Sequence, residues 1–246
     1  IDSQSQTSSV ASILNELFLY DKRHGWRKPD NYVNLFSSEQ QRLLENSDIS
    51  FLLDNSYFQD FDLDEDNLSN KLSQIFDSYA FYKTHMKAIV INVTNEKIIF
   101  INEDFDLGSI AWREEYDWAR EQISINELGP KPSSFNQILS FGDFIYLKAN
   151  DDSYILDQIP NIESSLISIN PNSGDVIAYV GGKNFNESNF DRVRLSFPQS
   201  GSSFKPFIYS SSLASGYNLS TLINDAPIVF KDENLESEWR PQNYTG

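Results

Sequence analysis

Cysteine is absent from this sequence, and histidine is scarce. None of the 246 residues is a cysteine, so disulfides, thiolate zinc sites and cysteine nucleophiles are excluded. Only His24 and His85 are present, which argues against a histidine-rich metal site. No phosphate-loop or dinucleotide-binding pattern surrounds the adjacent glycines Gly181 and Gly182. We therefore expect neither a metal nor a cofactor.

Positive charge is also in short supply. Lys and Arg total 19 against 36 Asp and Glu, which gives a formal net charge of −17. Such a field repels nucleic-acid phosphates and anionic membrane surfaces, so no nucleic-acid partner is expected. The acidic run DFDLDED at 60–66 lacks the ligand spacing and the glycine of a calcium loop. We interpret it as a solvated face or a linker.

Long apolar runs are missing as well. No segment is long and apolar enough to span a bilayer, and no signal-peptide pattern is present. The chain begins at Ile1 rather than at a methionine, so we expect a piece of a longer protein whose anchor lies outside it. Hydrophobic residues still make up 39% of the chain, enough for a core and for more than one domain.

The apolar pattern predicts one helix followed by short strands. The helix is predicted to start after an N-cap at Ser8 or Ser9 and to end at KRHG. His24 is expected there to interact favourably with the helix dipole rather than to act in catalysis. The strands are predicted at 88–93, 97–101, 143–148, 153–157, 165–169 and 175–180. Those within 85–160 suggest a small antiparallel barrel or sandwich, and the last two form a hairpin that turns at NPNSG.

Three aromatic residues between the strand pairs are surrounded by carboxylates rather than by basic side chains. They are Trp112, Tyr116 and Trp118. A platform for single-stranded nucleic acid would need Lys and Arg beside it. We therefore interpret these aromatic residues as core packing or as a protein contact.

Residues 202–205 form an S-x-x-K motif at the start of a predicted helix, in which Pro206 occupies the first turn. A spacing of three puts Ser202 and Lys205 on one helix face, within reach of a hydrogen bond. A neutral lysine amine could take the serine proton, while the helix N-terminus stabilises an oxyanion. Ser202 is thus the candidate nucleophile and Lys205 the candidate general base. The alternative is a capped helix with a solvated lysine.

The sequence around this motif resembles the class A, bifunctional penicillin-binding proteins. The resemblance is carried by residues 165–193 and 199–217 and by the pair 223–230 and 239–244. The segment YDKRHGWRKP, residues 20–29, resembles the one that precedes an OB-like insertion in that family. The middle of the chain, roughly 30–160, matches only in position and in β character.

The resemblance implies an α+β chain in three parts. Residues 1–29 would be a linker helix that leads into the transpeptidase domain, and 30–162 an OB-like insert with an acidic lead-in. Residues 163–246 would be the incomplete N-terminal part of that domain, which has the penicillin-binding and β-lactamase-like α/β fold. A β-rich, OB-like small barrel would thus be inserted into the first part of a serine acyl-transferase domain.

The resemblance also implies a DD-transpeptidase that cross-links peptidoglycan. Ser202 would attack the penultimate D-Ala of a stem peptide with Lys205 as general base, and β-lactam antibiotics would acylate the same serine. The other implied partners are a lipid-linked precursor, used by a glycosyltransferase in the parent protein, and an outer-membrane lipoprotein activator. The implied location is the periplasmic face of the bacterial inner membrane.

Some features of the family pattern are missing. Pro198 and Ser200 stand where the family often has a basic and a small apolar residue. Lys-Thr-Gly is absent, and the Ser-x-Asn triplets at Ser124, Ser134 and Ser168 all precede the nucleophile, so both motifs are expected outside the chain. Two alternatives stay open. One is a DD-carboxypeptidase or β-lactamase relative, and the other is an interaction module without catalysis.

Overall fold

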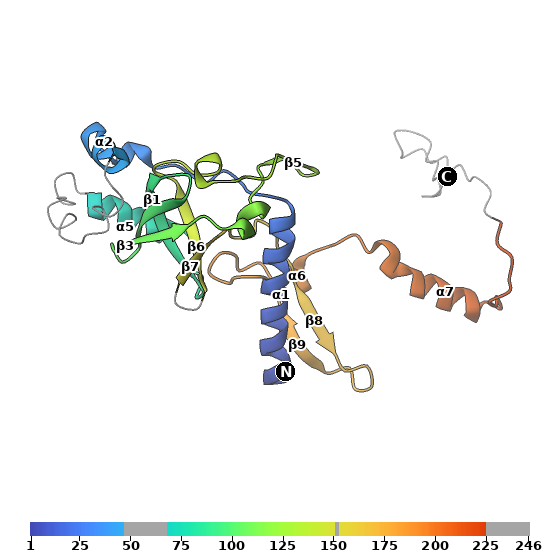
Figure 1. Ribbon diagram of the computed structural model, residues 1–246. Coiled ribbons are helices and arrows are strands. Elements are labelled where there is room, and N and C mark those ends of the chain that lie inside the picture. The colour runs from blue at the N-terminus through green and yellow to red at the C-terminus, as the bar shows by residue number, and fades with distance from the viewer. Residues whose placement is uncertain (47–67, 151–152, 225–246) are drawn as a thin grey trace, which may run out of the picture. The chain divides into compact units, whose positions relative to one another are not determined.

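The structure is a computed structural model that describes residues 1–46, 68–150 and 153–224 (Figure 1). These residues belong to two compact units, 1–196 and 197–246, and each is described by itself. The acidic run at 60–66 lies outside the described residues. Within the described ranges, no helix is both long enough and apolar enough to cross a membrane.

The first unit combines one long helix with a β-rich middle and a final hairpin. Its helices are α1 (Ser3–Arg23), α2 (Ser38–Asn46), α5 (Leu68–Ser78) and α6 (Arg192–Leu195), with 3₁₀ turns η1 (Val33–Leu35), η2 (Glu114–Trp118) and η3 (Phe135–Gln137). Its strands are β1 (His85–Val93), β2 (Lys97–Asn102), β3 (Leu107–Ala111), β4 (Gln122–Ser124), β5 (Glu127–Leu128), β6 (Phe144–Asn150), β7 (Ser153–Asp157), β8 (Leu166–Ile169) and β9 (Val176–Val180).

Five of these strands form one antiparallel sheet in the order β3-β2-β1-β6-β7. The register shifts between Val90 and Asn92 in the central strand β1, and such a bulge bends a sheet. The edge strands β3 and β7 contact each other, so the sheet curls into a small barrel (Figure 1). The predicted antiparallel barrel within an α+β chain is therefore confirmed.

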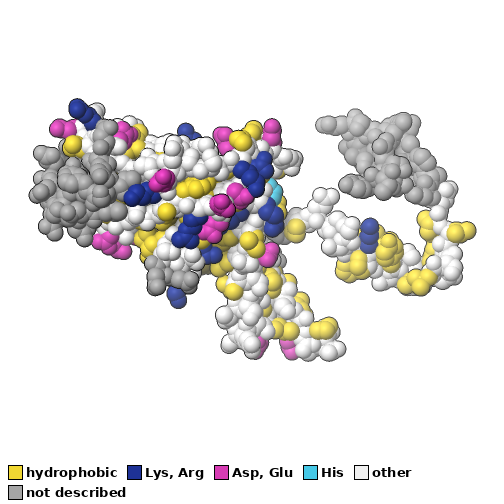
Figure 2. Space-filling model, in the orientation of Figure 1, with side chains coloured by type: hydrophobic (Ala, Val, Ile, Leu, Met, Phe, Trp, Pro, Cys, Tyr) yellow, Lys and Arg dark blue, Asp and Glu magenta, His cyan; other side chains and the backbone are white. Residues whose placement is uncertain are grey.

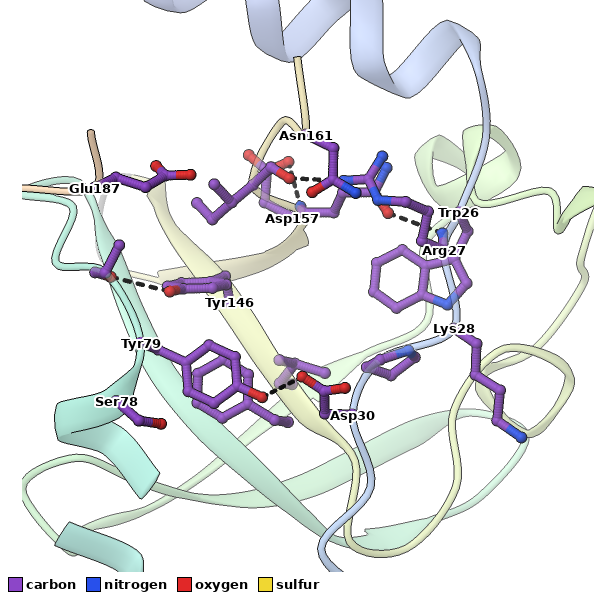
Figure 3. Close-up of a pocket in the computed structure, with 16 residues that line it drawn as sticks. Trp26, Arg27, Lys28, Asp30, Ser78, Tyr79, Tyr146, Asp157, Asn161 and Glu187 are labelled. Carbon is purple, nitrogen blue, oxygen red and sulfur yellow. Dashed lines mark hydrogen bonds between the residues drawn. The ribbon is translucent and has the colours of Figure 1, made fainter. Parts of the chain in front are cut away.

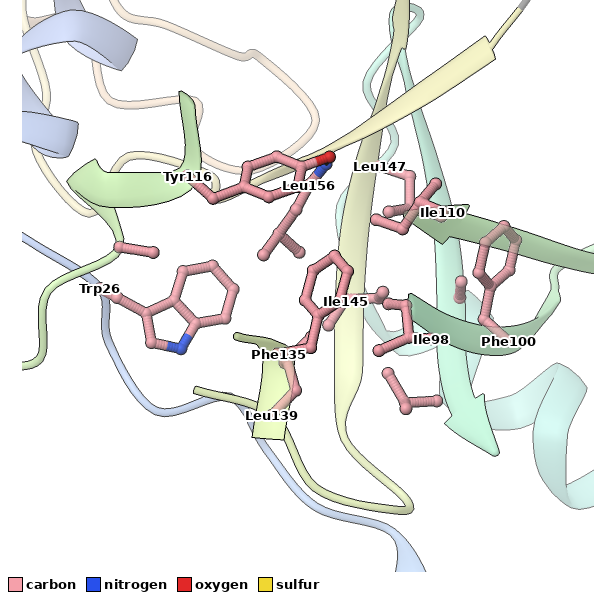
Figure 4. Close-up of a cluster of buried hydrophobic side chains, with 13 residues drawn as sticks. Trp26, Ile98, Phe100, Ile110, Tyr116, Phe135, Leu139, Ile145, Leu147 and Leu156 are labelled. Carbon is pink, nitrogen blue, oxygen red and sulfur yellow. The ribbon is translucent and has the colours of Figure 1, made fainter. Parts of the chain in front are cut away.

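The sheet buries apolar side chains on both faces. One cluster, enclosed by the sheet and turns η2 and η3, includes Trp26, Ile98, Phe100, Ile110, Tyr116, Phe135, Leu139, Ile145, Leu147 and Leu156 (Figure 4). The other includes Leu44 from α2 and Leu68, Leu72 and Phe76 from α5. Alternate residues of β1 enter the two clusters, Val90 the first and Ile91 the second. Burial on both faces explains why this strand is a continuous apolar run in the sequence.

The aromatic residues between the strand pairs pack in the first of these clusters. Tyr116 is 1% exposed, and its hydroxyl accepts a hydrogen bond from the Leu156 backbone nitrogen at 3.3 Å. Trp112 packs edge-on against Tyr116 and Phe135, with ring centroids 5.6 and 5.1 Å apart. Trp118 lies edge-on to Trp26 at 5.7 Å. The interpretation as core packing is confirmed.

Helix α1 ends where predicted but begins earlier. The prediction of an N-cap at Ser8 or Ser9 was wrong, because Asp2 is the N-cap and accepts a hydrogen bond from the Ser5 backbone nitrogen. The first turns are polar, so they carry no apolar periodicity to read. The Gln6 side-chain amide instead exchanges two hydrogen bonds of 2.8 Å with the backbone of Tyr179 on β9. A tertiary contact that no local pattern shows thus holds the first turns in place.

Candidate functional site

The predicted nucleophile and base lie in the second unit, at the start of its helix. Ser202 belongs to the 3₁₀ turn η4 (Gly201–Phe204), and Lys205 is the first residue of α7 (Lys205–Ala214). The Lys205 backbone nitrogen donates to the Ser202 carbonyl, so the turn leads directly into the helix. Pro206 stands in the first helical turn, as predicted.

The side chains of Ser202 and Lys205 are both exposed. No hydrogen bond or ion pair joins them, or either of them to another side chain, in the part of the chain that the structure describes. Turn η4 and helix α7 together expose a set of large apolar side chains (Figure 2). They are Phe204, Phe207, Ile208, Tyr209 and Leu213. The Ser202–Lys205 hydrogen bond therefore stays a prediction.

A buried polar cluster lies in the first unit, where α1 meets the barrel. The Asp157 side chain is 1% exposed and lies 3.0 Å from the Lys22 ammonium and 3.2 Å from His85 Nε2. Burial acts to raise the pKa of Asp157, but the hydrogen bond from His85 and the charge of Lys22 outweigh it and hold the pKa below its ordinary value. One carboxylate thus joins α1, β1 and β7.

A second buried carboxylate, Asp21, ties the chain entering the barrel to the chain leaving it. Arg27 Nη1 donates to both carboxylate oxygens of Asp21 at 2.8 Å, and its Nη2 donates to the Ile159 carbonyl at 2.7 Å. Gln158 Nε2 also donates to Asp21 at 2.8 Å. Asp21, Lys22 and Arg27 belong to the segment 20–29 that the sequence resemblance singled out, so this segment has a structural role at the junction.

A groove of about 430 Å³ opens beside this cluster (Figure 3). Its polar lining is largely engaged in hydrogen bonds within the protein, such as that from Tyr79 to Asp30 and the 2.9 Å bond from Tyr146 to the Ala80 carbonyl. No group of three metal-binding side chains occurs among the described residues. Four of the groove residues, 26–29, belong to the segment 20–29 that the resemblance quoted, but the sequence analysis predicted no binding site there.

We expect acid to weaken the fold through Asp157. A folded pKa below the unfolded value of 3.8 means that the ionised carboxylate stabilises the fold above about pH 4. That stability is lost as the pH falls through the folded pKa. In urea titrations from pH 7 to pH 3, Asp157→Asn should lower the free energy of unfolding at pH 7 by about 1–3 kcal/mol.

The same substitution should flatten the fall in stability between pH 4 and pH 3. Asp117→Asn is the matched control, because Asp117 pairs with Lys131 at the surface, where ion pairs contribute little. This control should keep the wild-type pH dependence. Identical pH profiles for the wild type and Asp157→Asn would contradict the assignment.

Comparison with known proteins identifies relatives of this chain. Residues 58–162 match the Penicillin-binding protein OB-like domain. Penicillin-binding protein 1A of Vibrio cholerae is 32% identical over the whole chain, and that of Pseudomonas aeruginosa is 40% identical over 64% of it. The chain spans 28% and 19% of the lengths of these two relatives.

A solved structure supports the fold. The crystal structure of penicillin-binding protein 1A from Haemophilus influenzae matches the whole chain with a TM-score of 0.68 at 22% identity, and the chain covers 30% of that protein. The curled sheet thus lies within a segment that matches an OB-like domain, and the fold of the chain is that of the solved structure. The chain belongs to the class A penicillin-binding proteins of the 1A type.

Proposed function

We propose that the protein containing this chain is a peptidoglycan synthase whose transpeptidase step uses Ser202 as nucleophile and Lys205 as general base. The observation that carries the proposal is the S-x-x-K motif at the start of α7. It lies within a chain that aligns along its whole length with a penicillin-binding protein 1A. The backbone N–H groups of a helix start are suited to stabilise the negative charge that develops on the attacked carbonyl.

The proposed reaction has two acyl transfers. Ser202 Oγ bonds to the carbonyl carbon of the penultimate D-Ala, and its proton passes to the Lys205 amine. The peptide bond to the terminal D-Ala breaks, and the departing amine takes up a proton. The amine of a neighbouring stem peptide then attacks the ester, which forms the cross-link and frees the serine.

The proposed domain division follows the sequence resemblance. Residues 1–29 lead into the transpeptidase domain, 30–162 are the inserted OB-like part, and 163–246 begin the transpeptidase domain proper. We place this protein at the periplasmic face of the inner membrane, with stem peptides, a lipid-linked precursor and β-lactams as its ligands. A glycosyltransferase activity is proposed for the parent protein.

The OB-like domain carries a second proposed role, the docking of an activator such as an outer-membrane lipoprotein. The β4–β5 hairpin exposes two apolar side chains, Ile123 and Ile125, between the acidic residues Glu121 and Glu127.

Labelling by a fluorescent penicillin distinguishes a catalytic protein from one that only binds a partner. An interaction module without catalysis would take no label even in the whole protein, and a β-lactamase relative would release the label by hydrolysis.

The isolated 246-residue chain should label poorly with a fluorescent penicillin. Lys205 is exposed in the second unit, and the chain has neither a Lys-Thr-Gly nor a Ser-x-Asn triplet after Ser202 to complete the family's active site. Gel fluorescence after incubation should show much slower acylation of the isolated chain than of the whole protein at equal concentration. Equally rapid acylation of the two would contradict this expectation.

A further inference from the structure

Two ion-pair clusters, each built around one buried charged side chain, link the barrel to the part of the first unit formed by α1 and the β8–β9 hairpin. We name Lys22, His85 and Asp157 the first latch, and Tyr82, Lys183 and Glu187 the second latch. We infer that the two latches hold the OB-like barrel and the α1/β8–β9 part as one rigid body. The barrel is then a fixed arm on the transpeptidase side of the protein rather than a module on a flexible tether.

The α1/β8–β9 part is itself one packed piece. Ile13 and Leu17 of α1 bury their side chains against Val180 of β9. The chain leaves this piece after α1 and returns to it before β8, so two chain passages connect it to the barrel. Asp21 ties these two passages to each other, but a single joined crossing would still leave a hinge. Relative motion is the usual behaviour of domains whose interface is small and polar.

The first latch restricts motion at the end of α1. Lys22 reaches Asp157 from the last turn of α1, and His85 reaches the same carboxylate from the start of β1. Phe18, one turn earlier on α1, stacks on the His85 ring with centroids 4.9 Å apart and an angle of 9° between the planes. The end of α1 is therefore fixed against the barrel by both charge and ring contact.

The second latch restricts motion of the segment that follows β9. The Lys183 side chain is 3% exposed, and its ammonium lies 2.8 Å from Glu187 and donates to the Pro160 carbonyl at 2.5 Å. Glu187 in turn accepts a hydrogen bond from the Tyr82 hydroxyl, just before β1. This lysine follows the two glycines that end β9, so the hairpin and the barrel meet at Glu187.

Two latches at separate points fix the orientation of the barrel relative to the α1/β8–β9 part, which a single latch could not do. A single contact leaves rotation about itself, whereas a second contact away from the first removes that rotation. Buried ion pairs add little net stability compared with apolar packing, but their geometry is directional. They are thus better suited to set how two parts are oriented than to hold them together.

The absence of cysteine allows a direct distance measurement. Asn15 on α1 and Glu96 in the β1–β2 turn are exposed, so Asn15→Cys with Glu96→Cys gives two nitroxide sites, whose separation is measured by double electron–electron resonance. In the full chain we expect one narrow distance distribution. Combining Lys22→Met with Lys183→Met should abolish the narrow peak. Lys131→Met, which removes a surface ion pair, should leave it unchanged.

A second variant controls for unfolding of the lysine variant, because a carboxylate left buried without a partner destabilises a protein. It carries Lys22→Met and Asp157→Asn at the first latch and Lys183→Met and Glu187→Gln at the second. Glu163, 3.8 Å from the Lys183 ammonium, keeps Arg192 as a partner at 3.5 Å. Circular dichroism should show a folded barrel, while the distance distribution is broad.

Three outcomes would overturn the inference. They are a broad distribution in the wild-type protein, a narrow one in the folded neutral variant, or unfolding of that variant, which would show that the clusters maintain the fold rather than the orientation. The measured distance does not depend on Ser202 chemistry, so failure of the proposed function would leave this test intact.

Discussion

The Ser202→Ala variant of the whole protein should lose covalent labelling by a fluorescent penicillin, down to the background of a denatured sample. The hydroxyl oxygen of Ser202 is the atom that would form the acyl bond, and alanine supplies no replacement nucleophile. Removing the nucleophile of a catalytic group that acts as a unit costs several orders of magnitude in rate. The measurement is gel fluorescence after a fixed incubation, with the amount of folded protein checked by circular dichroism.

Ser203→Ala provides the matched control. Ser203 lies in the same turn, η4, but stands two residues before Lys205 rather than three. Its substitution should leave the labelling close to that of the wild type. Label that survives Ser202→Ala, or that disappears only with Ser203→Ala, would contradict the assignment of the nucleophile.

The Phe135→Ala variant should show the largest loss of stability among single core substitutions in the barrel. Phe135 is 0% exposed and packs against the rings of Trp112 and Tyr116. Truncating a fully buried phenylalanine removes its burial energy and leaves a cavity, which costs about 3–5 kcal/mol. Urea denaturation followed by tryptophan fluorescence measures the change.

Phe185→Ala is the control for this substitution, because the Phe185 side chain is 75% exposed in the same unit. Its effect should stay within about 0.5 kcal/mol. Similar losses for the two variants would mean that Phe135 does not fill the barrel core.

Strands were the part of the fold that the sequence predicted best. The segment 153–157 coincides with β7, and the predicted 97–101 is one residue shorter than β2. Both are bounded by polar turns, and local turn chemistry sets such ends. The short strands β3, β4 and β5 were missed because none contains a continuous apolar run and all depend on neighbouring strands for their hydrogen bonds.

The candidate catalytic pair could be predicted, but the junction could not. Ser202 and Lys205 stand three residues apart in a motif that is visible in one line of sequence. Asp157 and His85 are 72 residues apart and meet because β1 and β7 flank the same strand, β6, in the sheet. A buried ion pair of this kind has no local signal, since each partner alone looks like an ordinary polar residue at a strand end.

Mass spectrometry of the penicillin-treated whole protein tests the central claim most directly. Trypsin should release a peptide that begins at Leu195, after Arg194, and contains the whole S-x-x-K motif. We predict that this peptide carries the mass of one opened β-lactam and that fragmentation places it on Ser202. An adduct on any other residue of the protein, or no adduct on a protein shown to be folded, would contradict the account.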